Sequence, residues 1–236
     1  TVYQHDPELP NSLGNNTVRV LYEDRAGKLW IGTEGGGLNA YDREQEQFLR
    51  YQHHPEDPYS LSHNSVSTIF EDRSGTLWIG TWNGGLNQFD RATGKFTSYQ
   101  HHPDDSGSLS HNEVNVIYED QSGVLWVGTW GGGLNSFDPQ TGTFTHYRAE
   151  AANPHSLSSD VVFALYEDQA GVFWIGTADG LNTFDRETGQ FTRYKSDPNT
   201  PDSLSANDVR SMYADQAGML WIGTFGGGLN RFDRKT

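Results

Sequence analysis

Aromatic, arginine and histidine side chains stand at three places where five otherwise similar segments of this sequence differ. The first place follows a recurring threonine and holds Glu34, Trp82, Trp130, Ala178 and Phe225. The second holds Asn15, His63, His111, Ser159 and Ala206, and the third holds Arg19, Ser67, Asn115, Phe163 and Arg210. Exposed aromatic rings stack on the C–H faces of sugars, while Asn, Arg and His side chains hydrogen-bond to the hydroxyls.

These variable positions therefore predict a site for a small molecule or a glycan at one end of the molecule. The candidate ligand-binding residues are Trp82, Trp130, Phe225, Glu34, His63, His111, Arg19, Asn115 and Arg210. The alternative interpretation is that the aromatic residues only cap hairpin turns and pack on neighbouring loops.

An enzymatic interpretation uses some of the same residues. A lyase acting on a polysaccharide or a cyclic ester needs a base, such as His63 or His111, and a charge stabiliser, such as Arg19 or Arg210. The sequence has no Gly-x-Ser-x-Gly turn, no His-Glu-x-x-His motif and no cysteine nucleophile. We therefore expect a binding protein without catalytic residues.

The composition excludes several classes of partner. A formal net charge of -15 over 236 residues would repel nucleic acid and anionic membrane surfaces. No apolar run approaches the roughly 20 residues of a membrane span. The absence of cysteine excludes disulfides and thiolate metal sites. The histidine pairs His53-His54 and His101-His102 would need further converging ligands to hold zinc, so we expect no metal and no cofactor.

A unit of about 48 residues, present five times, must position the variable residues. The motif Leu29 to Thr33 contains Trp30, and tryptophans recur 48, 48, 48 and 47 residues further on at Trp78, Trp126, Trp174 and Trp221. The shorter last step comes from a trimmed turn, Thr177 to Asn182. In the first unit, turn residues separate four predicted strands: Val18 to Asp24, Leu29 to Thr33, Leu38 to Tyr41 and Phe48 to Gln52.

Four short antiparallel strands per unit predict an all-β fold, a five-bladed β-propeller. We expect a single domain, residues 1–236, with units near 11–58, 59–106, 107–153, 154–201, and 202–236 plus 1–10. Thr1 to Pro7 aligns with the fourth strand Leu49 to Pro55, whereas Asn230 to Thr236 follows a third strand. The N-terminal strand is therefore expected to complete the last blade and close the ring, which removes unpaired strand edges.

Residues that occur in all five units are expected to serve the fold. The first set is Asp24, Asp72, Asp120, Asp168 and Asp215, each three residues before a glycine. An aspartate in this place accepts backbone N–H groups across a hairpin turn. The second set is Trp30, Trp78, Trp126, Trp174 and Trp221, expected to pack between blades.

The pattern Glu71 to Thr81, followed by Gly84 to Asn87 and by Phe89-Asp90, resembles the two-component-regulator propeller repeat. The resemblance covers essentially the whole chain. It implies a sensor propeller of a hybrid histidine kinase that detects ligands, often glycans, outside the bacterial cytoplasm. Five units are fewer than that family usually has, so an excised or engineered propeller without a native ligand is the alternative, cytoplasmic if produced as a recombinant chain. We expect a monomer, with a strand-swapped oligomer as the alternative.

Overall fold

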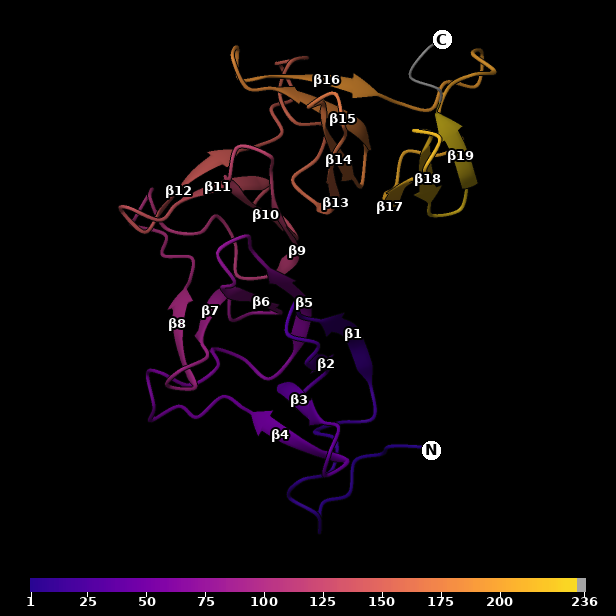
Figure 1. Ribbon diagram of the computed structural model, residues 1–236. Helices are drawn as coiled ribbons and strands as arrows, with labels where there is room; N and C mark the ends of the chain where they lie inside the picture. Colours follow the sequence, from indigo (N-terminus) through magenta and orange to yellow (C-terminus); the bar gives the residue numbers. More distant parts are fainter. Residues whose placement is uncertain (233–236) are drawn as a thin grey trace. The chain divides into compact units, whose positions relative to one another are not determined.

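The computed structural model describes residues 1–232, which form antiparallel strands joined by turns (Figure 1). The first eight strands are β1 (Val18–Glu23), β2 (Leu29–Thr33), β3 (Leu38–Asp42), β4 (Gln47–Tyr51), β5 (Val66–Glu71), β6 (Leu77–Thr81), β7 (Leu86–Asp90) and β8 (Lys95–Tyr99). The next eight are β9 (Val114–Glu119), β10 (Leu125–Thr129), β11 (Leu134–Asp138), β12 (Thr143–Tyr147), β13 (Val162–Glu167), β14 (Phe173–Thr177), β15 (Gly180–Asp185) and β16 (Gln190–Tyr194). The last three are β17 (Val209–Ala214), β18 (Leu220–Thr224) and β19 (Gly228–Phe232).

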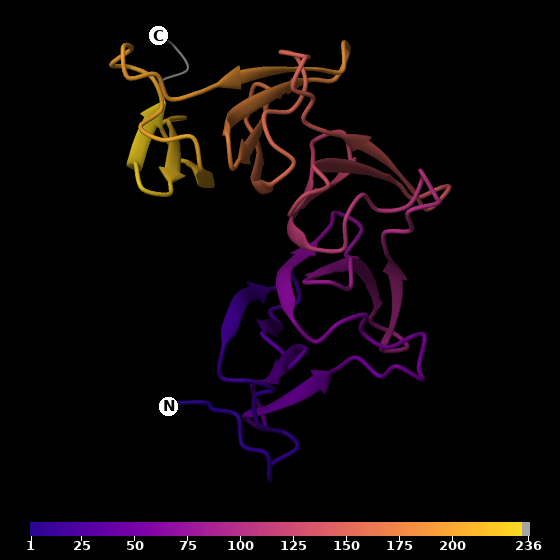
Figure 2. The same cartoon turned by 180° about the vertical axis from the view of Figure 1, so that it is seen from behind.

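The prediction of five antiparallel sheets is confirmed. Four sheets have four strands each in chain order, and the fifth has three strands, β17 to β19, within residues 1–232. A long connection leads from the fourth strand of one sheet to the first strand of the next (Figure 2). The turns after the first and third strands lie at one end of each sheet, which we call the Asp–Trp end. The turns after the second strand, at Glu34, Trp82, Trp130, Ala178 and Phe225, mark the opposite end, which we call the variable end.

Two compact units, which are larger than the five sequence repeats, make up the chain. They are Thr1–Ile117 and the part from Tyr118 onward, and each is described by itself. In the first unit, Trp30 and Leu38 pack with Val66 and Ile69 in one buried cluster between the first two sheets. In the second unit, a cluster of the same kind has the members Trp174, Leu181, Val209, Leu220 and Ile222. Apolar packing between successive sheets therefore supplies the core of each unit.

The second strands β6, β10 and β14 are buried along their whole length. All five residues of β6 are buried, whereas in β8 only Phe96 is buried and the other positions are more accessible. The recurring glycine explains how neighbouring sheets approach so closely. A Cβ atom at Gly80 would lie 2.5 Å from Thr68 Cγ2 and 2.6 Å from Val114 Cγ1. Any side chain at this position would therefore force the sheets apart.

The N-terminal segment packs against the first sheet but forms no strand over residues 1–5. The Tyr3 ring lies 5.3 Å from Tyr41 and 5.5 Å from Phe48, centroid to centroid. A hydrogen bond joins the Tyr3 and Tyr41 hydroxyls at 2.5 Å, and it raises the pKa of Tyr41 to about 12. The expected pairing of this segment with the fifth sheet remains a prediction.

Candidate functional site

Backbone hydrogen bonds hold the turns of the variable end. The amide of Trp82 donates to the Ser65 carbonyl at 2.9 Å, and the amide of Phe225 donates to the Asp208 carbonyl at 2.8 Å. Trp130 forms an isolated β-bridge with Val161. Because the backbone is tied down in this way, each of these turns presents its aromatic side chain from a fixed base.

A β-bulge lies at the third variable position. The register of β1 with β2 shifts between Val18 and Val20, around Arg19, and the register of β17 with β18 shifts between Val209 and Ser211, around Arg210. Phe163 lies in an equivalent bulge of β13. A bulge adds an unpaired residue and redirects its side chain. The sequence repeat showed that this position varies, but it did not show the bulge.

In the first unit, Arg19, Glu34 and Trp82 come together. The Arg19 guanidinium carbon lies 4.7 Å from the centroid of the Trp82 ring, a cation–π distance. Arg19 also forms an ion pair with Glu34. The Trp82 side chain keeps 36% of its surface exposed. One face of this tryptophan is therefore supported by a neutralised cation while part of the ring remains accessible.

A larger cluster forms in the second unit, and we call Trp130, Phe163, Arg210 and Phe225 the aromatic cluster. The Arg210 guanidinium carbon lies 3.8 Å from the Phe163 ring, 5.4 Å from Phe225 and 5.9 Å from Trp130. Trp130 meets Phe163 edge to face at 5.3 Å. Asp208 binds Arg210 with N to O distances of 2.7 Å, so the charge of the guanidinium is compensated. Trp130 and Phe225 are 45% and 71% exposed.

Two residues of the aromatic cluster's environment were not among the predicted site residues. Phe163 was recognised only as a variable position, and Asp208 was not singled out. The signal for Phe163 was its place at the same repeat position as Arg19 and Arg210. Asp208 lies two residues before Arg210, which is a spacing that becomes informative only once the bulge is known.

His63 and His111 hold their own turns. The amide of Ser65 donates to Nδ1 of His63 at 3.1 Å, and the amide of Glu113 donates to Nδ1 of His111 at 3.1 Å. Side chains at this repeat position thus act as local acceptors, as Asn and Ser do in Asx and ST turns. Burial, with a smaller contribution from the charge of His53, lowers the pKa of His63. Asn115 lies half-buried on β9.

At the Asp–Trp end, the five recurring aspartates and tryptophans make the same contact. Asp24 Oδ1 accepts the amides of Ala26 and Lys28, and Oδ2 accepts the indole N–H of Trp30 at 2.8 Å. The other four indoles donate to their aspartates at 2.8 to 3.0 Å. Each carboxylate therefore closes a hairpin turn and fixes the tryptophan ring, a contact that joins residues six positions apart.

Two arginines tie neighbouring sheets together at this end. Arg91 binds Asp24 of the preceding sheet at 2.5 Å and Glu71 of its own sheet at 2.9 Å. Arg186 binds Asp120 and Glu167, each at 3.0 Å. Burial alone would raise the pKa of Asp24, but the hydrogen bonds from Arg91, Trp30 and Lys28 lower it below the ordinary value.

Burial and hydrogen bonding also act in opposite directions on the pKa of Asp120. Burial would raise it, but hydrogen bonds from Ser122, Trp126, Val124 and Arg186 lower it. The third sequence repeat carries Pro139 where the second and fourth repeats carry arginine. Both arginines can be identified in the sequence, but the sequence does not indicate that each contacts an aspartate 66 or 67 residues away.

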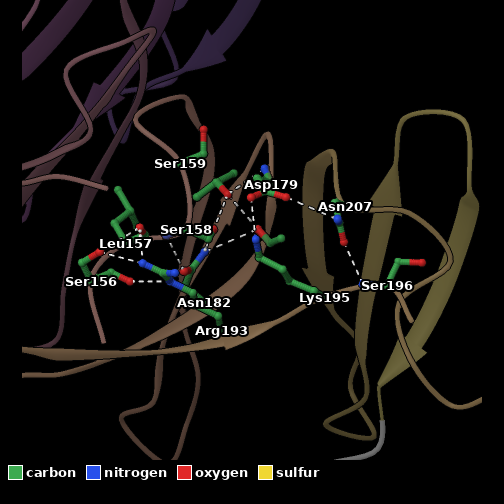
Figure 3. Close-up of polar contacts among 12 residues, drawn as sticks. Ser156, Leu157, Ser158, Ser159, Asp179, Asn182, Arg193, Lys195, Ser196 and Asn207 are labelled. Atoms are coloured by element: carbon green, nitrogen blue, oxygen red, sulfur yellow. Dashed lines mark hydrogen bonds and ion pairs between the residues drawn. The ribbon is translucent and has the colours of Figure 1, made fainter. Parts of the chain in front are cut away.

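The trimmed turn of the fourth sequence repeat, Thr177 to Asn182, carries a separate polar network. Asp179 accepts hydrogen bonds from Lys195 at 2.5 Å and from Asn207 at 3.3 Å. Asn207 in turn accepts the amide of Ser196 at 2.7 Å (Figure 3). Asp179 therefore links the turn to both ends of the connection that leads into β17.

Within residues 1–232, no group of three or more histidine, cysteine, aspartate or glutamate side chains is arranged to hold a metal ion. The same described residues contain no helix that is both long and apolar enough to cross a bilayer.

Two family models match the sequence. Residues 12–35 and 60–83 match the two component regulator propeller, and residues 113–233, just over half of the chain, match the SMP-30/gluconolactonase/LRE-like region. No curated protein matches the chain.

Solved structures of similar chains include extracellular domains from B. thetaiotaomicron. One belongs to a putative hybrid two component system, with 28% identity, a TM-score of 0.70, and coverage of 97% of this chain and 35% of that one. Another, from a putative one component system, has 27% identity, a TM-score of 0.74 and coverage of 100% and 30%. The chain thus spans about a third of the length of these structures.

A more distant similarity concerns the fold alone. Virginiamycin B lyase from Staphylococcus aureus is 15% identical with a TM-score of 0.64, and the match covers 95% of this chain and 71% of the lyase.

Proposed function

Because the chain belongs to the two component regulator propeller family by residues 12–35 and 60–83, and to the SMP-30/gluconolactonase/LRE-like family by residues 113–233, we propose a non-enzymatic ligand-binding function. The ligand is a neutral glycan or a similar small molecule, and it binds at the variable end. The similarity to extracellular domains of two-component systems supports a sensory role of this kind.

The aromatic cluster of the second unit is the observation that carries the proposal. Trp130 and Phe225 expose large apolar surfaces, and Phe163 and Arg210 join them in the cluster through contacts of 3.8 to 5.9 Å. Exposed rings held in this manner suit the C–H face of a sugar. Asp208 neutralises Arg210, so the surface favours an uncharged ligand over an anionic one.

A glycan array followed by calorimetry tests this function. Wild-type chain should bind at least one neutral glycan, and Trp130→Ala or Phe225→Ala should weaken binding at least tenfold, equivalent to about 1.4 kcal/mol. Tyr59→Ala is the matched control, because Tyr59 is also an exposed aromatic ring beside a cation, Lys95, but lies outside the aromatic cluster. Absence of any glycan ligand, or equal binding by all variants, would refute the proposal and favour a scaffold without a ligand.

An enzymatic role has weaker support from the site. A lyase needs a free cation beside a base, yet Arg19 and Arg210 are each paired with a carboxylate, and His63 and His111 each use Nδ1 to hold a turn. An eliminase assay on uronic-acid polymers, followed by absorbance of the unsaturated product, addresses this alternative. Turnover that is lost in His63→Ala or His111→Ala would establish it.

Closure of the ring by the N-terminal segment belongs to the same proposal. Tyr3 packs on Tyr41 and Phe48 as Tyr51 packs on Phe89 and Phe96, so Thr1 to Tyr3 follow the course of a fourth strand. By the register of β3 with β4, Val2 would pair with Asn230 of β19.

Engineered cysteines test closure cleanly because the native chain has none. Oxidation of the Val2→Cys/Asn230→Cys variant should give a disulfide within one chain. A disulfide between two chains would indicate strand swapping. The control is Val2→Cys/Asn182→Cys, because the edge beside Asn182 is already paired with β16. No disulfide in the first variant, or equal yields in both, would contradict closure.

A further inference from the structure

The trimmed turn of the fourth sequence repeat is joined to the turn that carries Trp130. Val161 forms the isolated β-bridge with Trp130, and the carbonyl of Val161 also accepts the amide of Ala178 at 3.0 Å. The bridge and the hydrogen bond place the trimmed turn beside the first exposed ring of the aromatic cluster.

Hydrogen bonds of the backbone also join the trimmed turn to the turn that carries Phe225. The amide of Gly180 donates to the Asn207 carbonyl at 2.7 Å. The carbonyl of the next residue, Asp208, accepts the amide of Phe225 at 2.8 Å. Three turns of the second unit therefore follow one another along the variable end, and the trimmed turn is the middle one.

Polar groups take the place of an aromatic ring at this middle turn. Ala178 has the smallest side chain at its repeat position, which otherwise holds tryptophan, phenylalanine or glutamate. The next residue, Asp179, keeps 47% of its side-chain surface exposed and forms an ion pair with Lys195, which keeps 40% exposed. A ligand on the rings of Trp130 and Phe225 therefore has a carboxylate and an ammonium group beside it.

The Asp179 carboxylate has acceptor capacity left for a ligand. Its Oδ2 accepts a hydrogen bond from Lys195 Nζ at 2.5 Å, and its Oδ1 accepts one from Asn207 Nδ2 at 3.3 Å (Figure 3). An ionised carboxylate has about four lone-pair sites, two on each oxygen. Within residues 1–232 these two side chains are its donors, so one site on each oxygen is open.

Two open sites on the two oxygens of one carboxylate fit two neighbouring hydroxyl groups. Hydroxyls on adjacent carbons can each donate to a different oxygen, as two N–H groups of arginine do in a bidentate pair. Lys195 compensates the charge of Asp179, just as Asp208 compensates that of Arg210. The trimmed turn and the aromatic cluster therefore both favour an uncharged ligand.

We propose that Asp179 determines which sugars bind at the aromatic cluster, by accepting hydrogen bonds from a vicinal diol of a neutral glycan. The sugar stacks its C–H face on the aromatic cluster and directs two adjacent hydroxyls to the carboxylate. A site built to bind a hydroxyl rejects an analogue that lacks it, because the protein group then loses its partner. The inference rests on the proposed glycan-binding function and adds the group that the ligand must carry.

A glycan microarray printed in two forms tests the requirement for hydroxyls. Each neutral oligosaccharide is present as the native compound and with its hydroxyls O-methylated, which keeps the C–H faces of the rings but removes the O–H donors. The full chain should bind the native form at least tenfold more tightly. Equal binding of the two forms would overturn the inference and leave the proposed function standing. Binding of neither form would refute the proposed function and the inference with it.

Variants of the chain assign the preference to Asp179. Asp179→Ala should weaken binding of the native glycan at least tenfold. Glu23→Ala is the matched control, because Glu23 is also an exposed carboxylate in an ion pair, with Arg43, but lies at the Asp–Trp end. Circular dichroism establishes that both variants are folded. Equal affinity of the two variants would contradict the role of Asp179 even if Trp130→Ala abolishes binding.

A ring placed in the trimmed turn gives a second, independent variant. Tryptophan stands at this position in the second and third repeats, at Trp82 and Trp130, so the fold accepts it in turns of this kind. Ala178→Trp should cover Asp179 and weaken binding of the native glycan at least tenfold, with an unfolding midpoint close to that of wild type. Tighter binding by this variant would show that stacking alone selects the ligand and would overturn the inference.

Discussion

Trp126 and Trp130 lie four residues apart, and they show how the two ends of one sheet differ. Trp126, on β10, is 3% exposed, and its indole N–H is held by Asp120 at 2.8 Å. Trp130, just beyond β10, is 45% exposed and lies in the aromatic cluster. The first tryptophan recurs in every repeat, whereas the position of the second holds tryptophan in one other repeat, at Trp82, and glutamate, alanine or phenylalanine in the remaining three. Repetition thus marks residues that build the sheet, and variation marks residues that the sheet leaves free.

The largest expected effect is loss of stability at the recurring tryptophan. Trp126→Ala removes a buried ring and leaves the Asp120 carboxylate without its indole donor, so the free energy of unfolding should fall by about 3–5 kcal/mol. Guanidinium unfolding followed by circular dichroism measures this. A loss of unfolding free energy no larger than that caused by replacing the exposed Trp130 with alanine would contradict this difference between the two ends of the sheet.

Glycine at the variable end gives the next effect. Gly85 has φ of 75°, and a Cβ there would lie 2.3 Å from the Tyr99 carbonyl oxygen. Gly85→Ala should therefore cost at least about 2 kcal/mol in the free energy of unfolding. Gly189→Ala is the control, since Gly189 has φ of 69° with nothing near its Cβ, and it should cost about 1 kcal/mol. Equal costs would show that backbone strain alone accounts for the glycine.

The arginine contact at the Asp–Trp end should be visible in the dependence of stability on pH. The lowered pKa of Asp24 means that its contribution is present above the unfolded value of 3.8 and is lost as pH falls through the folded value. Arg91→Gln should lower the free energy of unfolding by about 1–2 kcal/mol at pH 7, since Arg91 is one third exposed.

As pH falls below 3.8 and through the lower folded pKa of Asp24, the stability of wild type and of Arg91→Gln should converge, because the protonated Asp24 no longer distinguishes them. Unfolding midpoints at pH 7, 5 and 3 provide the measurement. A difference that stays constant over this range would mean that Arg91 acts through packing rather than through its charge.

The smallest effect on stability is expected at Trp82, the exposed tryptophan of the compact unit Thr1–Ile117. Trp82→Ala removes a cation–π contact with Arg19 at a partly exposed site, which is worth about 0.5–1 kcal/mol. A thermal unfolding scan should show a small shift beside that of Trp78→Ala, four residues earlier on β6. A loss as large as that of Trp78→Ala would assign Trp82 to the fold.

Much of the local structure follows from the sequence alone. The predicted strands of the first unit agree with β1 to β4 within one residue at each end, because glycine and aspartate turns bound short β-branched and aromatic runs. The hydrogen bond from Trp30 to Asp24 could also have been read from the hairpin, since β1 and β2 pair Glu23 with Leu29.

Contacts between sheets could not be read from the repeat. Arg91 reaches Asp24 across 67 residues, and Phe163, Arg210 and Phe225 meet only because bulges redirect two of them. These contacts depend on how one sheet packs on the next, which the pattern within a unit does not contain. The candidate residues therefore came from variation, while their grouping required the structure.

Binding and stability measured together on Trp130→Ala test the central claim most directly. The exposed aromatic side chains of the variable end are proposed to bind ligand without supporting the fold. Calorimetry should accordingly show at least a tenfold loss of glycan affinity, while the guanidinium unfolding midpoint stays close to that of wild type. A variant that unfolds as readily as Trp126→Ala, or that keeps full affinity, would contradict the division between an end that builds the sheets and an end that binds.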